Sequence, residues 1–119
     1  MNNEAILQLD NDMYEQIKMI LEYYGWDRQQ KKACEALSEL LAEILHHDPF
    51  DRLESKDVYK SITSKVANVC IMLEQIVKMY SIKKSDIDKE MADKLKRTEA
   101  KIIEEARRSR IKGIGLEGQ

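Results

Sequence analysis

The chain has 119 residues, which is long enough for one domain with a core, and its 35% of charged residues sum to a net charge of −2. This balance argues against a general nucleic-acid binder, which is normally basic. Neither cysteine, Cys34 or Cys70, belongs to a Cys-x-x-Cys pair, so we expect two reduced thiols in the core. No apolar run reaches membrane-spanning length, and the first four residues, Met-Asn-Asn-Glu, lack the basic start and apolar region that are typical of a signal peptide. We therefore expect a cytoplasmic protein without a membrane segment.

Four glycines and one proline leave few helix breakers, which favours an all-α fold. The first helix is predicted over residues 11–24 and ends at Gly25, as is common for a glycine just past a helix. The second is predicted to begin at Asp27, in a capping box, and to end near residue 46 or 47, before Pro49. Its apolar stripe at helical spacing is Leu37, Leu40, Leu41, Ile44 and Leu45.

A polar connection is expected over residues 48–55, followed by a third helix that extends to Tyr80. Ser85 is the predicted cap of a fourth helix, which has an inner face of Ile87, Met91, Leu95, Ile102 and Ala106. The four helices predict an antiparallel four-helix bundle, or part of one. We expect residues 1–112 to form a single helical domain and residues 113–119 a flexible tail. A chain of this size is only marginally stable alone, so pairing with a second copy is plausible.

Three glutamates recur every four residues on the second helix: Glu35, Glu39 and Glu43. On a helix they form a ladder of carboxylates on one face. Two carboxylates one turn apart can reach one Mg²⁺ ion, which fills its remaining positions with water and phosphate oxygens. The same spacing is common on solvated helix faces, so the ladder alone leaves both interpretations open.

A resemblance to a known protein family favours the metal-binding interpretation of these glutamates. Residues 35–40, then residues 65–69, then the run Cys-Ile-Met-Leu-Glu-Gln over 70–75 resemble the MazG-like all-α nucleoside triphosphate pyrophosphohydrolases, which are related to the dimeric dUTPases. That family carries Glu-Glu-x-x-Glu on one helix and Glu-x-x-Asp on the next. The likeness covers roughly residues 13 to 103 and implies a MazG-like bundle, a homodimer, and an enzyme often encoded by phages or mobile elements. In such an enzyme, four acidic residues bind Mg²⁺, which holds a nucleoside triphosphate and activates water to release pyrophosphate.

The sequence departs from this family pattern at the metal ligands. Glu35 and Glu39 match, but Ala36 replaces the second glutamate. Lys65 and Asn68 replace the glutamate and the aspartate of the second element. We therefore expect a degenerate site in which Lys65 pairs with Glu35 and Glu39 and occupies the place of the metal, with Asn68 as a remaining weak ligand.

A shifted metal site remains an alternative, because Glu43 extends the ladder and Glu54 and Asp57 precede the third helix. His46 and His47 diverge by about 100° on a helix, so we expect them to interact with the helix C-terminus rather than to chelate one ion.

Three further residues are candidate nucleotide contacts. Lys94 and Arg97 share one face of the fourth helix, and the resemblance implies contact with phosphates; solvated charges are the alternative. Trp26, the only tryptophan, is suited to stack on a base or to cover the core at a helix junction.

Two functions are consistent with these features. The first, which the charge pattern favours, is a catalytically weak or inactive relative that binds a nucleotide or a protein partner. The alternative is an active Mg²⁺-dependent hydrolase that converts nucleoside triphosphates to monophosphates and pyrophosphate.

Overall fold

The computed structural model of the protein describes residues 5–47 and 56–117, and these residues form four α-helices and no strand. The helices are α1 (Asn11–Tyr24), α2 (Trp26–His46), α3 (Lys56–Met79) and α4 (Lys84–Glu117). The all-α prediction is therefore confirmed. The connection predicted over residues 48–55, with the alternative ligand Glu54, lies outside the described residues.

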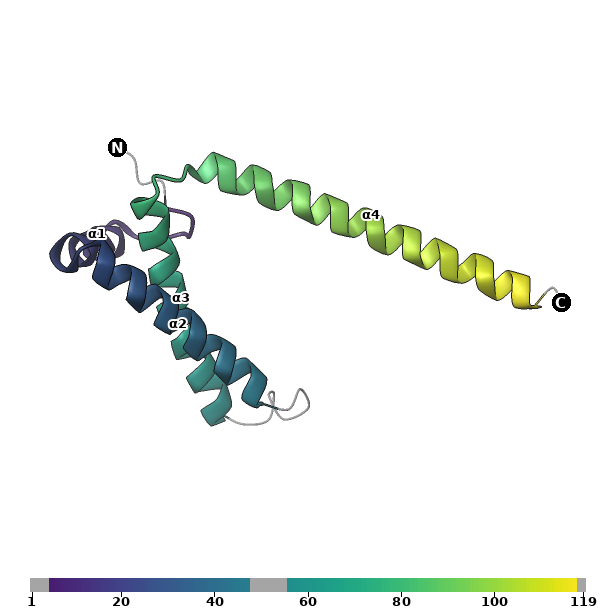
Figure 1. Ribbon diagram of the computed structural model, residues 1–119, viewed down its shortest axis with the longest axis horizontal. Coiled ribbons are helices and arrows are strands. Elements are labelled where there is room, and N and C mark those ends of the chain that lie inside the picture. The colour runs from purple at the N-terminus through teal and green to yellow at the C-terminus, as the bar shows by residue number, and fades with distance from the viewer. Residues whose placement is uncertain (1–4, 48–55, 118–119) are drawn as a thin grey trace. The chain divides into compact units, whose positions relative to one another are not determined.

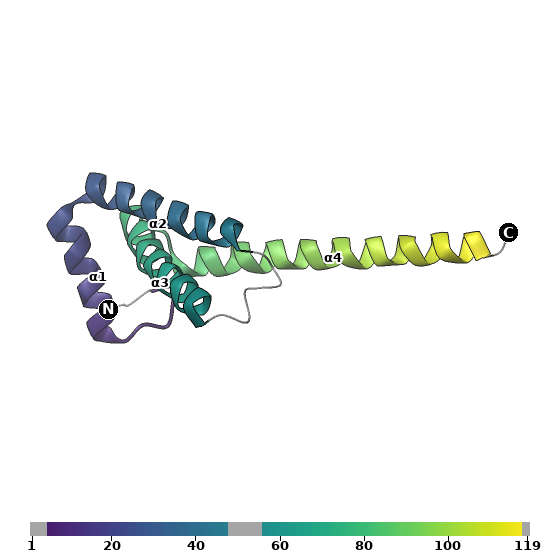
Figure 2. The same ribbon diagram turned by 90° about the horizontal axis from the view of Figure 1, so that it is seen from below.

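Two compact units make up the chain, residues 1–83 and residues 84–119, and each is described here by itself. In the first unit, α2 and α3 lie side by side and run in opposite directions (Figure 1). The view turned by 90° shows the same pairing (Figure 2). α1 contacts both helices, so this unit is a three-helix arrangement around one seam.

Gly25 joins α1 to α2 with a backbone conformation that other residues rarely adopt. Its φ of 84° and ψ of 167° fall in a region that is essentially restricted to glycine. Its amide donates to the Leu21 carbonyl at 2.9 Å, and its own carbonyl accepts from the Gln29 amide at 3.1 Å, so one residue ends α1 and starts α2. The predicted cap at Asp27 is wrong, because the glycine already starts the helix and Trp26 is its first residue.

The seam between α2 and α3 leaves most of the leucine stripe of α2 uncovered. Ala33 and Ala36 are buried there, whereas only Leu40 of the leucine stripe is partly covered. The rest of that stripe is 45 to 75% exposed: Leu37, Leu41, Ile44 and Leu45. Small side chains let the two helices approach closely, and the larger apolar residues are displaced to the flank of the seam.

A pair of buried amides connects the three helices of the first unit. Gln75 has no exposed surface and Gln29 is 3% exposed. The Gln29 Nε2 donates to Gln75 Oε1 at 2.7 Å, and the Gln75 Nε2 donates to the Ile17 carbonyl at 3.5 Å. Buried polar groups are tolerated only when they are paired in this way.

Glu74, also 3% exposed, fixes the segment that precedes α1. Its two carboxylate oxygens accept the backbone amides of Ile6 at 3.2 Å and Leu7 at 2.7 Å. Glu74 and Gln75 belong to the run over residues 70–75 that carries the family resemblance. Their contacts in this unit are structural.

α3 ends in a Schellman motif at Ser81. The Ile82 amide donates to the Val77 carbonyl at 3.0 Å, and the Ser81 amide donates to the Lys78 carbonyl at 3.2 Å. Ser81 has a φ of 52°, in the left-handed region where a side chain is disfavoured.

We expect Ser81→Gly to raise the free energy of unfolding by about 0.5 to 1 kcal/mol, because glycine adopts this conformation without the steric cost of a Cβ. Ser81→Val is the matched opposite and is expected to lower it, since a β-branched residue tolerates the region least. Urea unfolding of the three proteins measures both changes, and a Ser81→Gly protein less stable than the wild type would contradict the expectation.

α4 forms the second unit alone, so no other element of that unit covers its apolar residues. It begins at Lys84, one residue before the predicted cap Ser85, and it extends beyond the predicted end at residue 112 to Glu117. The single domain over residues 1–112 and the flexible tail over 113–119 stay predictions. In the described parts of the chain, no helix has the length and apolarity that crossing a membrane requires.

Candidate functional site

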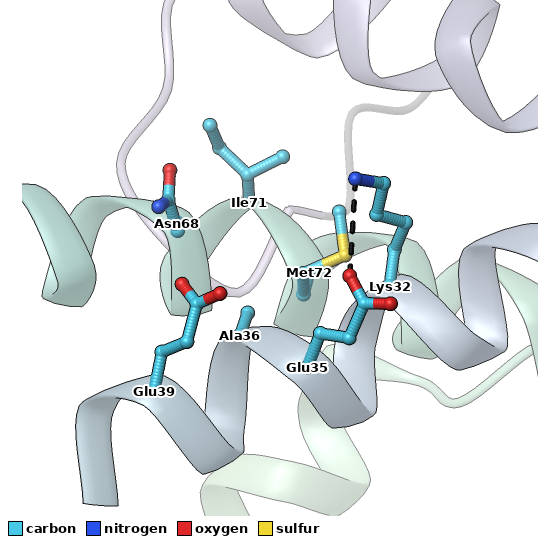
Figure 3. A pocket seen from close by; sticks show the side chains of 7 residues that line it. All are labelled: Lys32, Glu35, Ala36, Glu39, Asn68, Ile71 and Met72. Carbon is cyan, nitrogen blue, oxygen red and sulfur yellow. Dashed lines mark ion pairs between the residues drawn. The ribbon is translucent and has the colours of Figure 1, made fainter. Parts of the chain in front are cut away.

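A pocket of about 250 Å³ opens between α2 and α3 on one flank of their seam (Figure 3). Its lining comes from one face of each helix: Lys32, Glu35, Ala36 and Glu39 on α2, and Asn68, Ile71 and Met72 on α3. Positions three and four residues apart share a helix face, which explains why these seven side chains converge. The sequence predicted that Glu35, Glu39 and Asn68 belong to one site, and they line the same pocket.

The pocket carries two carboxylates, one ammonium group and one amide. Glu35 and Glu39 extend from α2 toward α3, on either side of Ala36 (Figure 3). Lys32 Nζ lies 3.9 Å from Glu35 Oε1, and both side chains are more than half exposed. An exposed ion pair of this kind contributes only about 0 to 1 kcal/mol to the free energy of unfolding. The main effect of Lys32 is therefore to reduce the net charge of the pocket to −1.

These groups fall short of the metal ligands that the resemblance implies. That family uses four carboxylates, and this pocket offers two, with a methyl group at Ala36 and a neutral amide at Asn68. Throughout the described residues, no group of three or more His, Cys, Asp or Glu side chains lies close enough to hold one ion. The residues present therefore do not fit the family's metal-binding set.

Lys65 has a different partner from the one predicted. Its Nζ lies 3.3 Å from Glu43 Oε1, one turn beyond Glu39, and it does not line the pocket. The expected ion pair of Lys65 with Glu35 and Glu39 is wrong in this structure, because the seam directs Lys65 toward the next carboxylate of the ladder.

Glu43 is the centre of a polar cluster that joins α2 to α3. Ser61 Oγ donates to Glu43 Oε1 at 2.7 Å, and Lys65 Nζ donates to Ser61 Oγ at 3.5 Å. His47 Nε2 donates to the other oxygen of the Glu43 carboxylate, from the end of α2. The alternative metal ligand Glu43 is thus occupied by three donors, and Asp57 is exposed in the first turn of α3.

The Glu43 cluster lowers the pKa of Glu43 from 4.5 to about 2. The hydrogen bond from Ser61 is the largest cause, followed by that from His47; burial opposes them, and Lys65 adds a smaller lowering. Each donor favours the charged form of the carboxylate. The cluster therefore depends on an ionised Glu43.

We expect the Glu43 cluster to make stability depend on acid pH. Because the folded pKa lies below the unfolded value of 4.5, the contribution is complete above pH 4.5 and is lost as the pH falls toward about 2. Thermal unfolding of wild type and Glu43→Gln should differ most near pH 6 and converge toward pH 2. A difference in melting temperature between the two proteins that stays constant from pH 6 to pH 2 would contradict the role given to ionised Glu43.

The remaining predicted contacts lie outside the pocket lining. Lys94 and Arg97 are exposed on α4, and Lys94 Nζ lies 3.9 Å from Glu90 Oε1. Trp26 is 56% exposed, and its ring centroid lies 6.1 Å from that of Tyr80 at an interplanar angle of 43°. The roles of these three residues in nucleotide binding stay predictions.

Sequence reasoning missed two groups of residues. Lys32 and Met72 line the pocket, and their spacing from Glu35 and Asn68 was the available signal. The donors around Glu43 were not foreseen, because Ser61 and Lys65 come from another helix and their register against α2 is not readable from one sequence.

Comparison with known proteins adds no relative. No family model, no curated protein and no solved structure matches the chain. The assignment of a function therefore depends on the pocket and on the motifs themselves.

Proposed function

We propose that the protein is a MazG-like nucleotide pyrophosphohydrolase-fold protein with a degraded Mg²⁺ site, catalytically weak or inactive, that binds a nucleotide or a protein partner. The observation that carries this proposal is the composition of the α2–α3 pocket. Glu35, Glu39 and Asn68 line one pocket between the two helices, and this pocket has two carboxylates where the family motif has four.

The charge of the pocket favours binding of a nucleotide over its hydrolysis. A hydrolase of this kind needs enough negative charge to hold a divalent ion against the phosphates. The net charge of −1 in this pocket leaves less attraction for such an ion, and Lys32 is available to contact an anionic group directly.

The alternative is an active Mg²⁺-dependent hydrolase of nucleoside triphosphates. One observation favours it: Glu35 and Glu39 both remain and line the same open pocket. Mg²⁺ is often bound by only one or two protein carboxylates together with substrate phosphates.

We further propose that the protein is cytoplasmic and, as the resemblance implies, a homodimer. In the same proposal, Lys94 and Arg97 contact phosphates, and Trp26 stacks on a base. The small apolar core of the first unit supports pairing of two copies, because a small unit alone buries little surface for its stability.

Incubation with a panel of ribo- and deoxyribonucleoside triphosphates, with Mg²⁺ or Mn²⁺, separates the two functions. We expect no pyrophosphate release above background. We expect the protein to bind a nucleotide, and Lys32→Ala to weaken that binding. Robust release that disappears in Glu39→Ala, with helix content unchanged, would establish the hydrolase instead.

A further inference from the structure

The C-terminal half of α4 is strongly basic, although the chain as a whole is slightly acidic. Residues 94–112 hold eight cations and three carboxylates, a net charge of +5, whereas the whole chain has −2. The residues outside this segment therefore sum to −7. Such an asymmetry of charge along a chain indicates a segment that binds a polyanion, and the total charge conceals it.

The eight cations of this segment lie on one side of the helix. At about 100° per residue, they fall within an arc of about 200° around the axis of α4. The rest of the circumference has no cation and holds seven residues: Leu95, Thr98, Glu99, Ile102, Glu105, Ala106 and Ser109. We define the cationic face as the eight exposed basic side chains: Lys94, Lys96, Arg97, Lys101, Arg107, Arg108, Arg110 and Lys112.

Few carboxylates neutralise the cationic face. Within residues 94–112, Glu104 is the only acidic residue inside the arc, and its Oε1 lies 2.8 Å from Arg107 and 3.1 Å from Arg108. Lys94 has the weaker contact with Glu90 described above. Among the described residues, no ion pair involves the other five cations: Lys96, Arg97, Lys101, Arg110 and Lys112. Their charges are therefore available to an external anion.

We infer that the cationic face binds the phosphate backbone of duplex DNA, with α4 lying along the major groove. This groove admits an α-helix, and phosphates border it on both sides, so a cationic arc wider than half of the helix has anionic partners on each side. Residues 94–112 form one continuous stretch of helix (Figure 1). They span about 27 Å, most of one turn of the duplex at about 34 Å.

Other polyanions fit the cationic face less well. A helix on an anionic membrane needs a broad apolar face, but Ile103 and Ile111 lie inside the cationic arc. Single-stranded nucleic acids are held largely by aromatic side chains that stack on the bases, and residues 84–119 include no Phe, Tyr or Trp. The major groove of duplex RNA is deep and narrow, which disfavours entry of a helix.

Fluorescence anisotropy of a labelled DNA duplex of about 20 base pairs and arbitrary sequence, titrated with the full chain, tests the inference. We expect a dissociation constant of about 1 to 100 µM at physiological salt, in the range of binding without sequence specificity. The logarithm of the association constant should fall with the logarithm of the salt concentration with a slope of about −4 to −5, as for five neutralised phosphates.

Lys101→Gln/Arg110→Gln/Lys112→Gln removes three cations without an ion pair and leaves Lys94 and Arg97 unchanged. We expect this variant to bind the duplex at least about 30-fold more weakly and to reduce the salt slope by about 3. The matched control is Lys18→Gln/Lys56→Gln/Lys60→Gln, which removes three exposed lysines of the first unit and should keep both values. Far-UV circular dichroism should show the same helix content in all three proteins.

Three results would overturn the inference. They are no binding of the duplex at low salt, an equal loss of affinity in the control variant, and tighter binding to vesicles of phosphatidylcholine and phosphatidylserine, or to a single DNA strand of the same length, than to the duplex. These readouts are independent of the α2–α3 pocket, where Lys32→Ala reports nucleotide binding separately.

Discussion

Replacement of Gln75 by leucine is expected to lower the free energy of unfolding by about 2 to 3 kcal/mol, although leucine is apolar and of similar size. Gln75 is fully buried and accepts the hydrogen bond from Gln29 Nε2 at 2.7 Å. In the variant, the Gln29 amide stays buried without its partner and loses both its water and its hydrogen bond. Urea unfolding monitored by circular dichroism measures the change.

The double variant Gln29→Leu/Gln75→Leu separates this cause from a change of shape. When both partners become apolar, no buried amide remains, and the double variant is expected to be more stable than Gln75→Leu alone. The coupling between the two sites should be about 1 to 3 kcal/mol. If the losses of unfolding free energy in the two single variants simply add in the double variant, the amide pair does not stabilise the unit.

The second large effect is expected in the pocket, where Ala36→Glu/Asn68→Asp should increase the affinity for Mg²⁺ by about tenfold or more. Both positions line the pocket beside Glu35 and Glu39, so the variant brings four carboxylates to one space. Lys65 is left unchanged, because its ammonium group is bound to Glu43 and its replacement would disturb the Glu43 cluster. Isothermal calorimetry with Mg²⁺ measures the gain.

The control for this gain adds two carboxylates to the same unit at another place. Gln16→Glu/Met19→Asp on α1 changes the net charge equally, and neither position lines the pocket. It should bind Mg²⁺ no better than the wild type. Equal gains in both variants would indicate a general charge effect. If Ala36→Glu/Asn68→Asp keeps the helix content of the wild type by circular dichroism and shows no gain, the pocket is not a degraded metal site.

Much of the fold was readable from the sequence because helix periodicity and breakers are local signals. α1 has the predicted bounds, and Gly25 ends it as expected. The start of α2 was misplaced because the backbone of Gly25 begins the helix without a side-chain cap. The leucine stripe of α2 was visible in the sequence, but periodicity identifies an apolar face and not the element that packs against it. Within the unit, α2 packs against α3 through the neighbouring face of α2, which carries Ala33 and Ala36.

The candidate site was predictable only where spacing on a single helix sufficed. Glu35 and Glu39 share a face by their four-residue spacing, and Asn68 was placed opposite them by the motif. The partner of Lys65 depended on the register of α3 against α2, where a shift of one turn exchanges Glu39 for Glu43. In the run over residues 70–75, Glu74 and Gln75 hold α1 and the segment that precedes it, contacts that the sequence did not indicate.

The most direct test of a degraded metal site is a titration of the wild-type chain with Mn²⁺, followed by the electron paramagnetic resonance signal of the free ion. Mn²⁺ prefers the same oxygen ligands as Mg²⁺. With two carboxylates and the Lys32 ammonium group in the pocket, we expect the free-ion signal to match that of buffer into the millimolar range. Stoichiometric uptake of Mn²⁺ at micromolar concentration that is abolished by Glu39→Ala would contradict the account.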